Sequence, residues 1–127
     1  MFQIHLKGEG FSGRGVRYRI LTPSELDRNE ITAAKTLDDA FTRAEYQVEV
    51  QRLGCVQMIV AYTDEGVTET QTAKWTTASA ATLDTQWDSV FCTKDSGVLR
   101  AIFQREHGVS KDEVDAILKG KAEVLAD

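Results

Sequence analysis

Three groups of residues have types and spacing that could support chemistry. The first is a glycine-rich string, Gly8-Glu9-Gly10-Phe11-Ser12-Gly13, which matches the GxGxxG fingerprint of dinucleotide-binding proteins. That fingerprint requires a strand before it and a helix after it, so that the phosphates rest on the helix N-terminus. Alternating apolar residues over 16–21 instead predict a strand after the glycines, and the sequence therefore does not predict a dinucleotide site.

A protein-kinase glycine loop does lie between two strands, and Val16 falls where such a loop carries valine. The Val-Ala-Ile-Lys, His-Arg-Asp and Asp-Phe-Gly elements of kinases do not occur later in the sequence. We therefore predict that residues 8–15 form the flexible tip of a β-hairpin. Phe11 and Arg14 in a mobile tip would suit a binding role that becomes ordered on contact.

The second group consists of the residues that could act as nucleophiles or metal ligands. Cys55 and Cys92 do not form a CxxC pair and fall on apolar faces of expected helices, which predicts reduced thiols in the core. His5 and His107 lack metal-ligand spacing, and a Cys92–His107 pair has no residue that would orient it. Acidic residues cluster at expected helix starts, where they complement the helix dipole. We therefore predict no metal, no cofactor and no enzymatic activity.

The third group is the segment 99–118, where a helix, the turn Gly108-Val109-Ser110 and a second helix resemble a helix-turn-helix. The second helix would expose one base and three acids, namely Lys111, Asp112, Glu113 and Asp115. Because these acids would repel DNA phosphates, a DNA-binding regulator is the less favoured alternative, and nucleic acid is not an expected partner.

Length and charge also limit the function. A chain of 127 residues predicts a single domain over 1–127. Residues 1–21 carry four bases against one acid, a net charge of +3, whereas the remainder carries a net charge of −8. A basic N-terminal element on an acidic body could contact a complementary surface, including another copy of the chain. The longest apolar run, 58–62, is too short to span a bilayer, so we expect a cytoplasmic protein with no membrane partner.

Local sequence signals predict the first elements. Two alternating segments within residues 1–21, joined by the glycine loop, predict a β-hairpin. A capping box formed by Thr22 and Glu25 predicts a helix over 23–35. An apolar stripe then predicts a long central helix over 39–62, in which Gly54 marks a close crossing or a kink. The residues of that stripe are Phe41, Ala44, Val48, Cys55, Ile59 and Tyr62.

The second half of the chain is less regular. Residues 63–82 are rich in threonine and predict either a loop or two short strands, at 67–72 and 74–77. Residues 83–120 predict three short helices, of which the second spans 98–107 with a cap at Asp95 or Ser96, and residues 121–127 form a tail. The predicted fold class is α+β, with an N-terminal β-hairpin followed by a mainly helical body of about five helices.

Five residues are candidates for a protein interface. Trp75 lies in the polar threonine-rich segment, which favours an exposed contact, whereas Trp87 fits a core stripe. The other candidates belong to the hairpin, and the full set is Phe11, Arg14, Arg17, Arg19 and Trp75. Because an isolated two-stranded hairpin is only marginally stable, we expect it to pair with the middle segment or with another subunit, which would make the chain a homo-oligomer.

Two segments resemble the tail assembly chaperones of long-tailed bacteriophages. One is Tyr18-Arg19-Ile20-Leu21-Thr22-Pro23-Ser24-Glu25-Leu26, and the other is Gly97-Val98-Leu99-Arg100-Ala101-Ile102-Phe103 with Gly108-Val109-Ser110 and the acidic segment 111–118. The resemblance implies a non-enzymatic protein in the host cytoplasm that coats the tape-measure protein and helps to recruit tail-tube subunits. It supplies no catalytic residues. An alternative is a phage structural subunit, such as a connector or minor tail component, that is retained in the virion.

Overall fold

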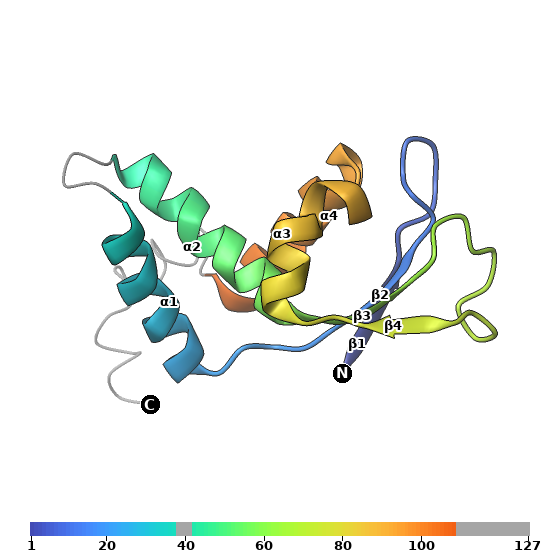
Figure 1. Cartoon of the computed structure of the whole chain (residues 1–127), viewed down its shortest axis with the longest axis horizontal. Coiled ribbons are helices and arrows are strands. Elements are labelled where there is room, and N and C mark those ends of the chain that lie inside the picture. Colours follow the sequence, from blue (N-terminus) through green and yellow to red (C-terminus); the bar gives the residue numbers. More distant parts are fainter. Residues whose placement is uncertain (38–41, 109–127) are drawn as a thin grey trace, which may run out of the picture.

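The fold combines an antiparallel sheet with helices, in the α+β class that the sequence predicts (Figure 1). The computed structural model describes residues 1–37 and 42–108. Within these ranges the elements, in chain order, are β1 (Phe2–His5), β2 (Gly15–Tyr18), α1 (Pro23–Thr36), α2 (Arg43–Met58), β3 (Ile59–Thr63), β4 (Trp75–Thr77), α3 (Ala80–Val90) and α4 (Thr93–His107).

The four strands form one sheet in the order β1-β2-β3-β4, and every neighbouring pair is antiparallel. The predicted hairpin is confirmed, because β1 pairs with β2 from Phe2↔Tyr18 to His5↔Gly15. A bulge between Arg17 and Tyr18 shifts the register between β2 and β3. The hairpin therefore joins a larger sheet through β2, and its outer strand β1 forms one edge.

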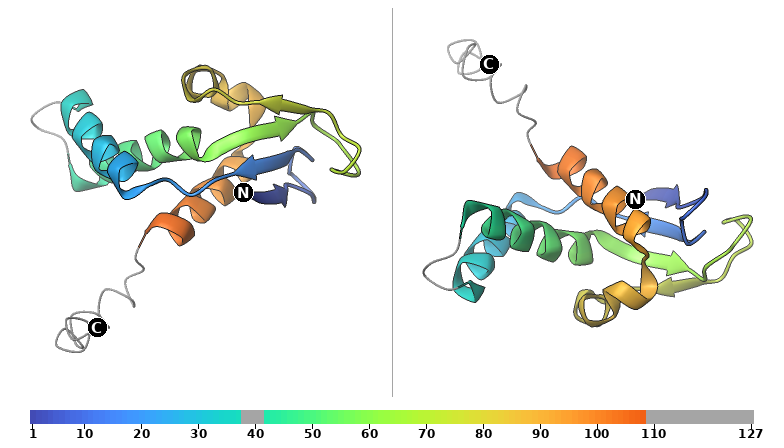
Figure 2. Two further views of the ribbon diagram at one scale, coloured as in Figure 1. Left: turned by 90° about the horizontal axis from the view of Figure 1, so that it is seen from below. Right: turned by 90° about the horizontal axis from the view of Figure 1, so that it is seen from above.

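Helices α3 and α4 lie over one face of the sheet, while α1 and α2 extend from one end as an arm (Figures 1 and 2). Two clusters of buried side chains make up the core between these parts. The first joins the sheet to α3 and α4 and contains Leu6, Val16, Ile59, Leu83, Phe91 and Leu99. The second joins the end of the sheet to α2 and α4 and contains Tyr18, Leu21, Cys55, Met58, Ile102 and Phe103.

The first helix begins as the sequence predicts. The hydroxyl of Thr22 accepts a hydrogen bond from the backbone N–H of Glu25, and the Glu25 carboxylate accepts one from the backbone N–H of Thr22. Asn29 of α1 and Gln57 of α2 then exchange two amide hydrogen bonds of 2.9 Å each. This polar pair, in which Asn29 is buried and Gln57 is partly exposed, fixes the rotation of one helix against the other.

The prediction of a helix over 39–62 is wrong at its C-terminal end. The helix α2 ends at Met58, and Ile59–Thr63 forms strand β3 between β2 and β4. The reason is that the backbone groups of β3 find partners on both sides in the sheet, which no local pattern reveals. Of the predicted stripe, Val48 is 49% exposed, and residues 38–41 lie outside the described part of the chain.

Other boundaries also differ from the predictions. Of the two short strands considered for the threonine-rich segment, only the second forms, as β4 at Trp75–Thr77. Helix α4 begins at Thr93, five residues before the predicted start, and Cys92 occupies the N-cap position. Four helices lie within the described residues, and the predicted fifth helix after Ser110 lies outside them.

Gly54 confirms the predicted close crossing, because a Cβ atom at this position would overlap the ring of Phe103 on α4. We expect Gly54→Ala to lower the free energy of unfolding by about 1–3 kcal/mol, since the crossing helices must move apart. The matched control is Gly97→Ala on the exposed side of α4, where a Cβ atom meets nothing within 4 Å. Its higher helix propensity should raise stability by up to ~1 kcal/mol. Urea denaturation compares the two variants, and equal effects would contradict the crossing.

Candidate protein-binding surface

The outer edge of β1 is the most accessible binding feature of the sheet. The backbone N–H of Leu6 donates to the carbonyl of Arg14, and the Leu6 carbonyl accepts from Gly13, both at 2.8 Å. Because alternate residues of a strand direct their backbone groups to opposite sides, Ile4 and Phe2 also face β2. Gln3 and His5 therefore direct their backbone groups away from the sheet, and no strand in the described ranges pairs with the outward side of Gln3.

The side chains of β1 itself are apolar or uncharged, and Arg17 of β2 donates to the Gln3 Oε1 at 3.4 Å. Phe2 is 47% exposed although its ring stacks on Tyr18, with ring centroids 5.3 Å apart, and Met1 is 80% exposed. No Asp, Glu, Lys or Arg occurs from Phe2 to Leu6. The opposite edge differs, because β4 has only three residues and follows Lys74. Edge lysines discourage strand addition, and no lysine lies within β1 or directly before it.

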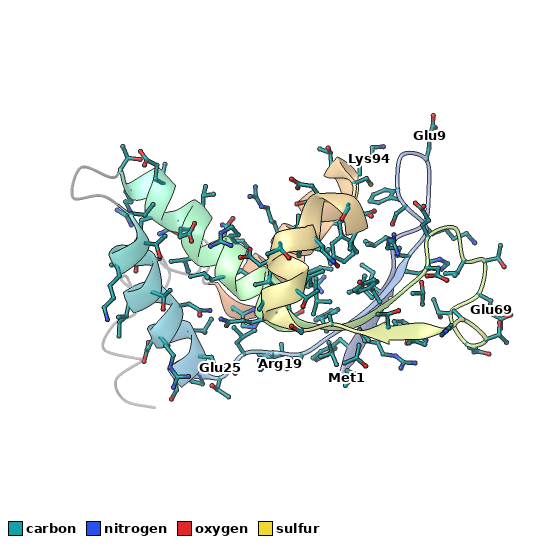
Figure 3. All side chains as sticks on the ribbon, viewed as in Figure 1. Met1, Glu9, Arg19, Glu25, Glu69 and Lys94 are labelled. Carbon is teal, nitrogen blue, oxygen red and sulfur yellow. The ribbon has the colours of Figure 1, made fainter. Side chains whose placement is uncertain are left out.

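The glycine loop at the end of the hairpin packs against the N-terminus of α4. Asp95, which is fully buried, accepts hydrogen bonds from the backbone N–H groups of Ser12 (3.1 Å) and Cys92 (3.3 Å). Lys94 donates to the Glu9 carbonyl at 2.9 Å, and Figure 3 shows Glu9 at the tip of the loop and Lys94 on the neighbouring helix. These contacts differ from the prediction of a flexible tip, because a carboxylate 83 positions away in the sequence holds the loop.

The candidates Phe11 and Arg14 both contact neighbouring elements within the chain. Phe11 packs against the first core cluster, with the Lys94 ammonium 5.5 Å from its ring centroid. Arg14 donates to the Val90 carbonyl at 2.7 Å and to the Thr63 carbonyl at 2.9 Å. The guanidinium therefore ties the hairpin to α3 and β3, and the two side chains hold the sheet and helices together.

Arg17 and Trp75 meet on the sheet face opposite α3 and α4. The Arg17 guanidinium lies 3.9 Å from the centre of the Trp75 ring, and the indole N–H donates to the Thr70 carbonyl at 3.3 Å. A Cβ atom on Gly15 would lie 2.8 Å from Thr70 and 3.0 Å from Trp75, so glycine permits this close packing. Trp75 is half-buried, and it covers the sheet together with the threonine-rich segment.

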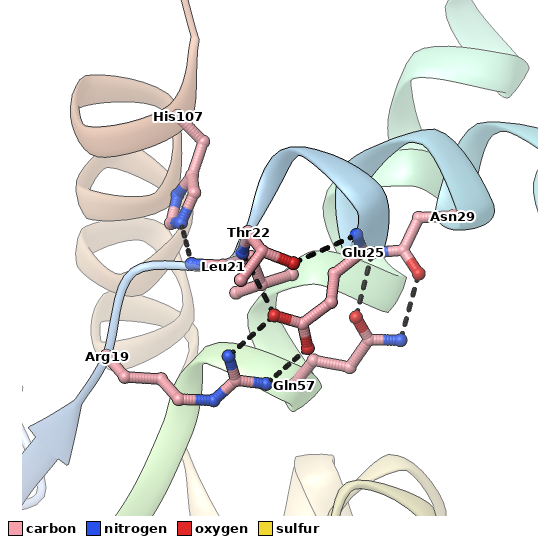
Figure 4. Close-up of polar contacts among 7 residues, drawn as sticks. All are labelled: Arg19, Leu21, Thr22, Glu25, Asn29, Gln57 and His107. Atoms are coloured by element: carbon pink, nitrogen blue, oxygen red, sulfur yellow. Dashed lines mark hydrogen bonds and ion pairs between the residues drawn. The ribbon is translucent and has the colours of Figure 1, made fainter.

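Arg19 forms a bidentate ion pair with Glu25 at 2.8 and 2.7 Å (Figure 4). This hydrogen-bonded guanidinium, together with the Thr22 backbone N–H, lowers the pKa of the Glu25 carboxyl to about 2. His107 lies nearby, where its Nε2 accepts from the Leu21 backbone N–H at 2.8 Å and its Nδ1 contacts the Phe103 carbonyl at 3.0 Å. These partners require a neutral imidazole with its proton on Nδ1.

The structure does not bring Cys92 and His107 together. They cap and end the same helix, α4, and therefore lie about 22 Å apart along its axis. Cys55 lines a cleft of about 280 Å³ between α2, α3 and α4, and burial raises the pKa of its thiol to about 12. Arg52 in the same cleft is already paired with Glu49 and Asp84. No histidine lines this cleft, so the thiol has no adjacent general base there.

In the described part of the chain, no group of three or more His, Cys, Asp or Glu side chains is arranged to hold a metal ion. None of the helices between residues 1 and 108 that the structure describes combines the length and apolar character needed to cross a membrane. The second helix of the possible helix-turn-helix lies outside the described residues.

Comparisons with protein-family models, with curated proteins and with solved structures found no match for this chain. Function must therefore be inferred from the geometry. The structure places all five predicted interface residues in intramolecular contacts, and of these five it brings Arg17 and Trp75 together. Sequence reasoning missed the edge of β1, although the uncharged segment from Phe2 to Leu6 carries a signal for it.

We expect Arg19→Met to return the pKa of Glu25 from about 2 toward its ordinary value of 4.5. A depressed carboxyl pKa contributes stability above the unfolded-state value and loses it as the pH falls toward 2. The stability difference between wild type and variant should therefore shrink over that pH range. Titration of the Glu25 carboxyl carbon by NMR measures the shift. Arg17→Met, which removes a guanidinium stacked on Trp75, should leave the Glu25 pKa unchanged.

We expect Asp95→Ala to lower the free energy of unfolding by about 1–3 kcal/mol, because the Ser12 and Cys92 N–H groups lose their acceptor. Amide exchange should also accelerate in residues 8–13 as the loop detaches. Asp88→Ala is the matched control, because that carboxylate is exposed on α3, and its effect should stay within about 0.5 kcal/mol. Unchanged exchange in the loop of Asp95→Ala would refute the role of this carboxylate.

Proposed function

We propose that this chain is a non-enzymatic protein–protein assembly factor that makes contact through the edge of β1. The observation that carries the proposal is the unpaired backbone of Gln3 on an uncharged edge beside the exposed Phe2 ring. An exposed sheet edge binds another strand through backbone hydrogen bonds, and flanking side chains add specificity. The edge therefore offers a surface for protein contact that needs no further rearrangement of the sheet.

The positions of the titratable side chains support binding over catalysis. The most deeply buried ones serve structure: Asp95 anchors the glycine loop, and Cys55 lies in a cleft without a histidine. His107 is held by Leu21 and Phe103 in a neutral form. Each of these groups is thus explained by a contact within the fold, and none requires a substrate.

The resemblance to tail assembly chaperones gives the proposal its specific form. Its first segment, 18–26, runs from the end of β2 through the Arg19–Glu25 pair into α1, and its second contains the buried part of α4. We propose the tape-measure and tail-tube proteins as partners, in the cytoplasm of an infected host. A structural subunit retained in the virion would use the same edge, and its presence in finished particles distinguishes the two roles.

Co-expression tests this function. A tagged chain is co-purified with the tape-measure and tail-tube proteins of the genome that encodes it. We expect a stable complex, and Gln3→Pro should reduce its recovery about tenfold, because proline removes the outward N–H without disturbing the hydrogen bonds to β2. Gln3→Ala is the matched control, since it removes the same side chain but keeps the N–H group, and recovery should be retained.

Absence of either partner protein from the purified complex would contradict the tail-assembly form of the proposal. Equal recovery with Gln3→Pro and Gln3→Ala would contradict contact through the β1 edge. Circular dichroism of both variants confirms that each is folded before the comparison is made.

A further inference from the structure

We infer that the β1 edge binds a second copy of this chain, with the two β1 strands antiparallel about a twofold axis at Gln3. The inference rests on the proposed function, in which the β1 edge is the contact surface, and it identifies a second copy of the chain as the molecule bound there. The β1 edge then supports capture of a tail protein indirectly, because a dimer presents two linked copies of every other surface.

The backbone geometry fits such a pair. Only the odd-numbered residues of β1 direct their N–H and C=O groups outward, as the hydrogen bonds of Leu6 to Arg14 and Gly13 establish. With Gln3 on the axis, its N–H donates to the Gln3 carbonyl of the second copy, and the reverse bond follows by symmetry. The His5 carbonyl already accepts from Lys7 at 2.9 Å, so an axis at His5 would compete with an existing bond. The axis at Gln3 has no such competitor.

The side chains favour the same register. An axis at Gln3 places Phe2 opposite Ile4 of the second copy, on the sheet face that carries α4. These two residues form a non-hydrogen-bonded pair in the new ladder, in which opposing side chains approach most closely. Phe2 is half-exposed in the single chain and Ile4 packs against both core clusters, so the contact extends the existing core across the edge.

Electrostatics also allow a copy as the partner. Two identical surfaces carry the same charges, and a charged edge would repel itself. The segment from Phe2 to Leu6 contains no Asp, Glu, Lys or Arg. The neighbouring Arg17 on β2 stacks on the Trp75 ring and donates from Nε to the Gln3 Oε1 at 3.4 Å. The strand β1 therefore brings no charged side chain of its own to the contact, whereas the exposed Lys74 precedes β4 at the opposite edge.

Disulfide trapping tests both the partner and the register. In the pair centred on Gln3, the two Gln3 Cα atoms would lie about 5.5 Å apart, a distance that a disulfide spans. In a Cys92→Ser background, Gln3→Cys should form a covalent dimer under mild oxidation. Thr77→Cys is the matched control, because Ala78 bonds to Val60 and so the backbone of Thr77 faces outward at the C-terminal end of β4, on the opposite edge. We expect at least tenfold less covalent dimer from it.

Light scattering over a series of concentrations provides the second measurement. We expect wild type and Gln3→Ala to dimerise as concentration rises, and Gln3→Pro to remain monomeric. A wild-type monomer at every concentration together with no trapping at Gln3→Cys would overturn the inference, as would preferential trapping at Thr77→Cys. If that monomer still captures a tail protein in a Gln3→Pro-sensitive manner, the proposed function stands and only the second copy is excluded. A trapped dimer that captures no tail protein would support the second copy at the β1 edge and contradict the proposed tail-assembly function.

Discussion

The junction between Met58 and Ile59 determines how the two parts of this fold are placed. Helix α2 passes into the inner strand β3 without a connecting residue, and both flanking side chains are buried. The direction of the helical arm is therefore fixed by the direction of the strand. The Met58 carbonyl also accepts from the Arg19 backbone N–H at 2.9 Å, which continues the contact with β2 beyond the sheet.

Helix α4 adds the second constraint because it crosses α2 at Gly54 and also covers the sheet. Its N-terminus holds the glycine loop through Asp95, and its C-terminus holds Leu21 through His107. The hairpin cannot be treated as a separate appendage, since β2 is an inner strand of the sheet. The basic segment 1–21 is thus part of the core structure as well as a source of exposed surface.

Sequence patterns predicted the elements that depend on interactions between residues close together in the chain. The sequence predicted the β-hairpin, the capping box of Thr22 and Glu25, and the buried face of α4. Each of these features depends on residues within one strand or within one or two helical turns. Residues 59–62 fit both a helical stripe and a buried strand, and only pairing with β2 and β4 resolves the ambiguity. The docked glycine loop was not predictable either, since its partner Asp95 is remote in sequence.

The predicted interface residues also depend on contacts that are remote in sequence and that the sequence could not predict. Arginines on a hairpin are typical of a binding surface, yet Arg14 caps carbonyls of distant segments and Arg17 stacks on Trp75. Their partners lie 49 or more positions away in the sequence, so residue type alone could not identify them. The edge of β1 was easier to predict than the contacts of these side chains. An alternating strand without charged residues lacks the usual protection of an edge strand, and this absence is visible in the sequence.

The inequality of the two sheet edges also governs the size of any assembly. Pairing β1 with β1 consumes both like edges and is closed, whereas pairing β1 with β4 of the next molecule would leave a free edge at each end and continue as an open chain. The three-residue length of β4 and the lysine before it disfavour that second mode. A sheet with one receptive and one protected edge is therefore limited to a finite particle and does not propagate as a fibre.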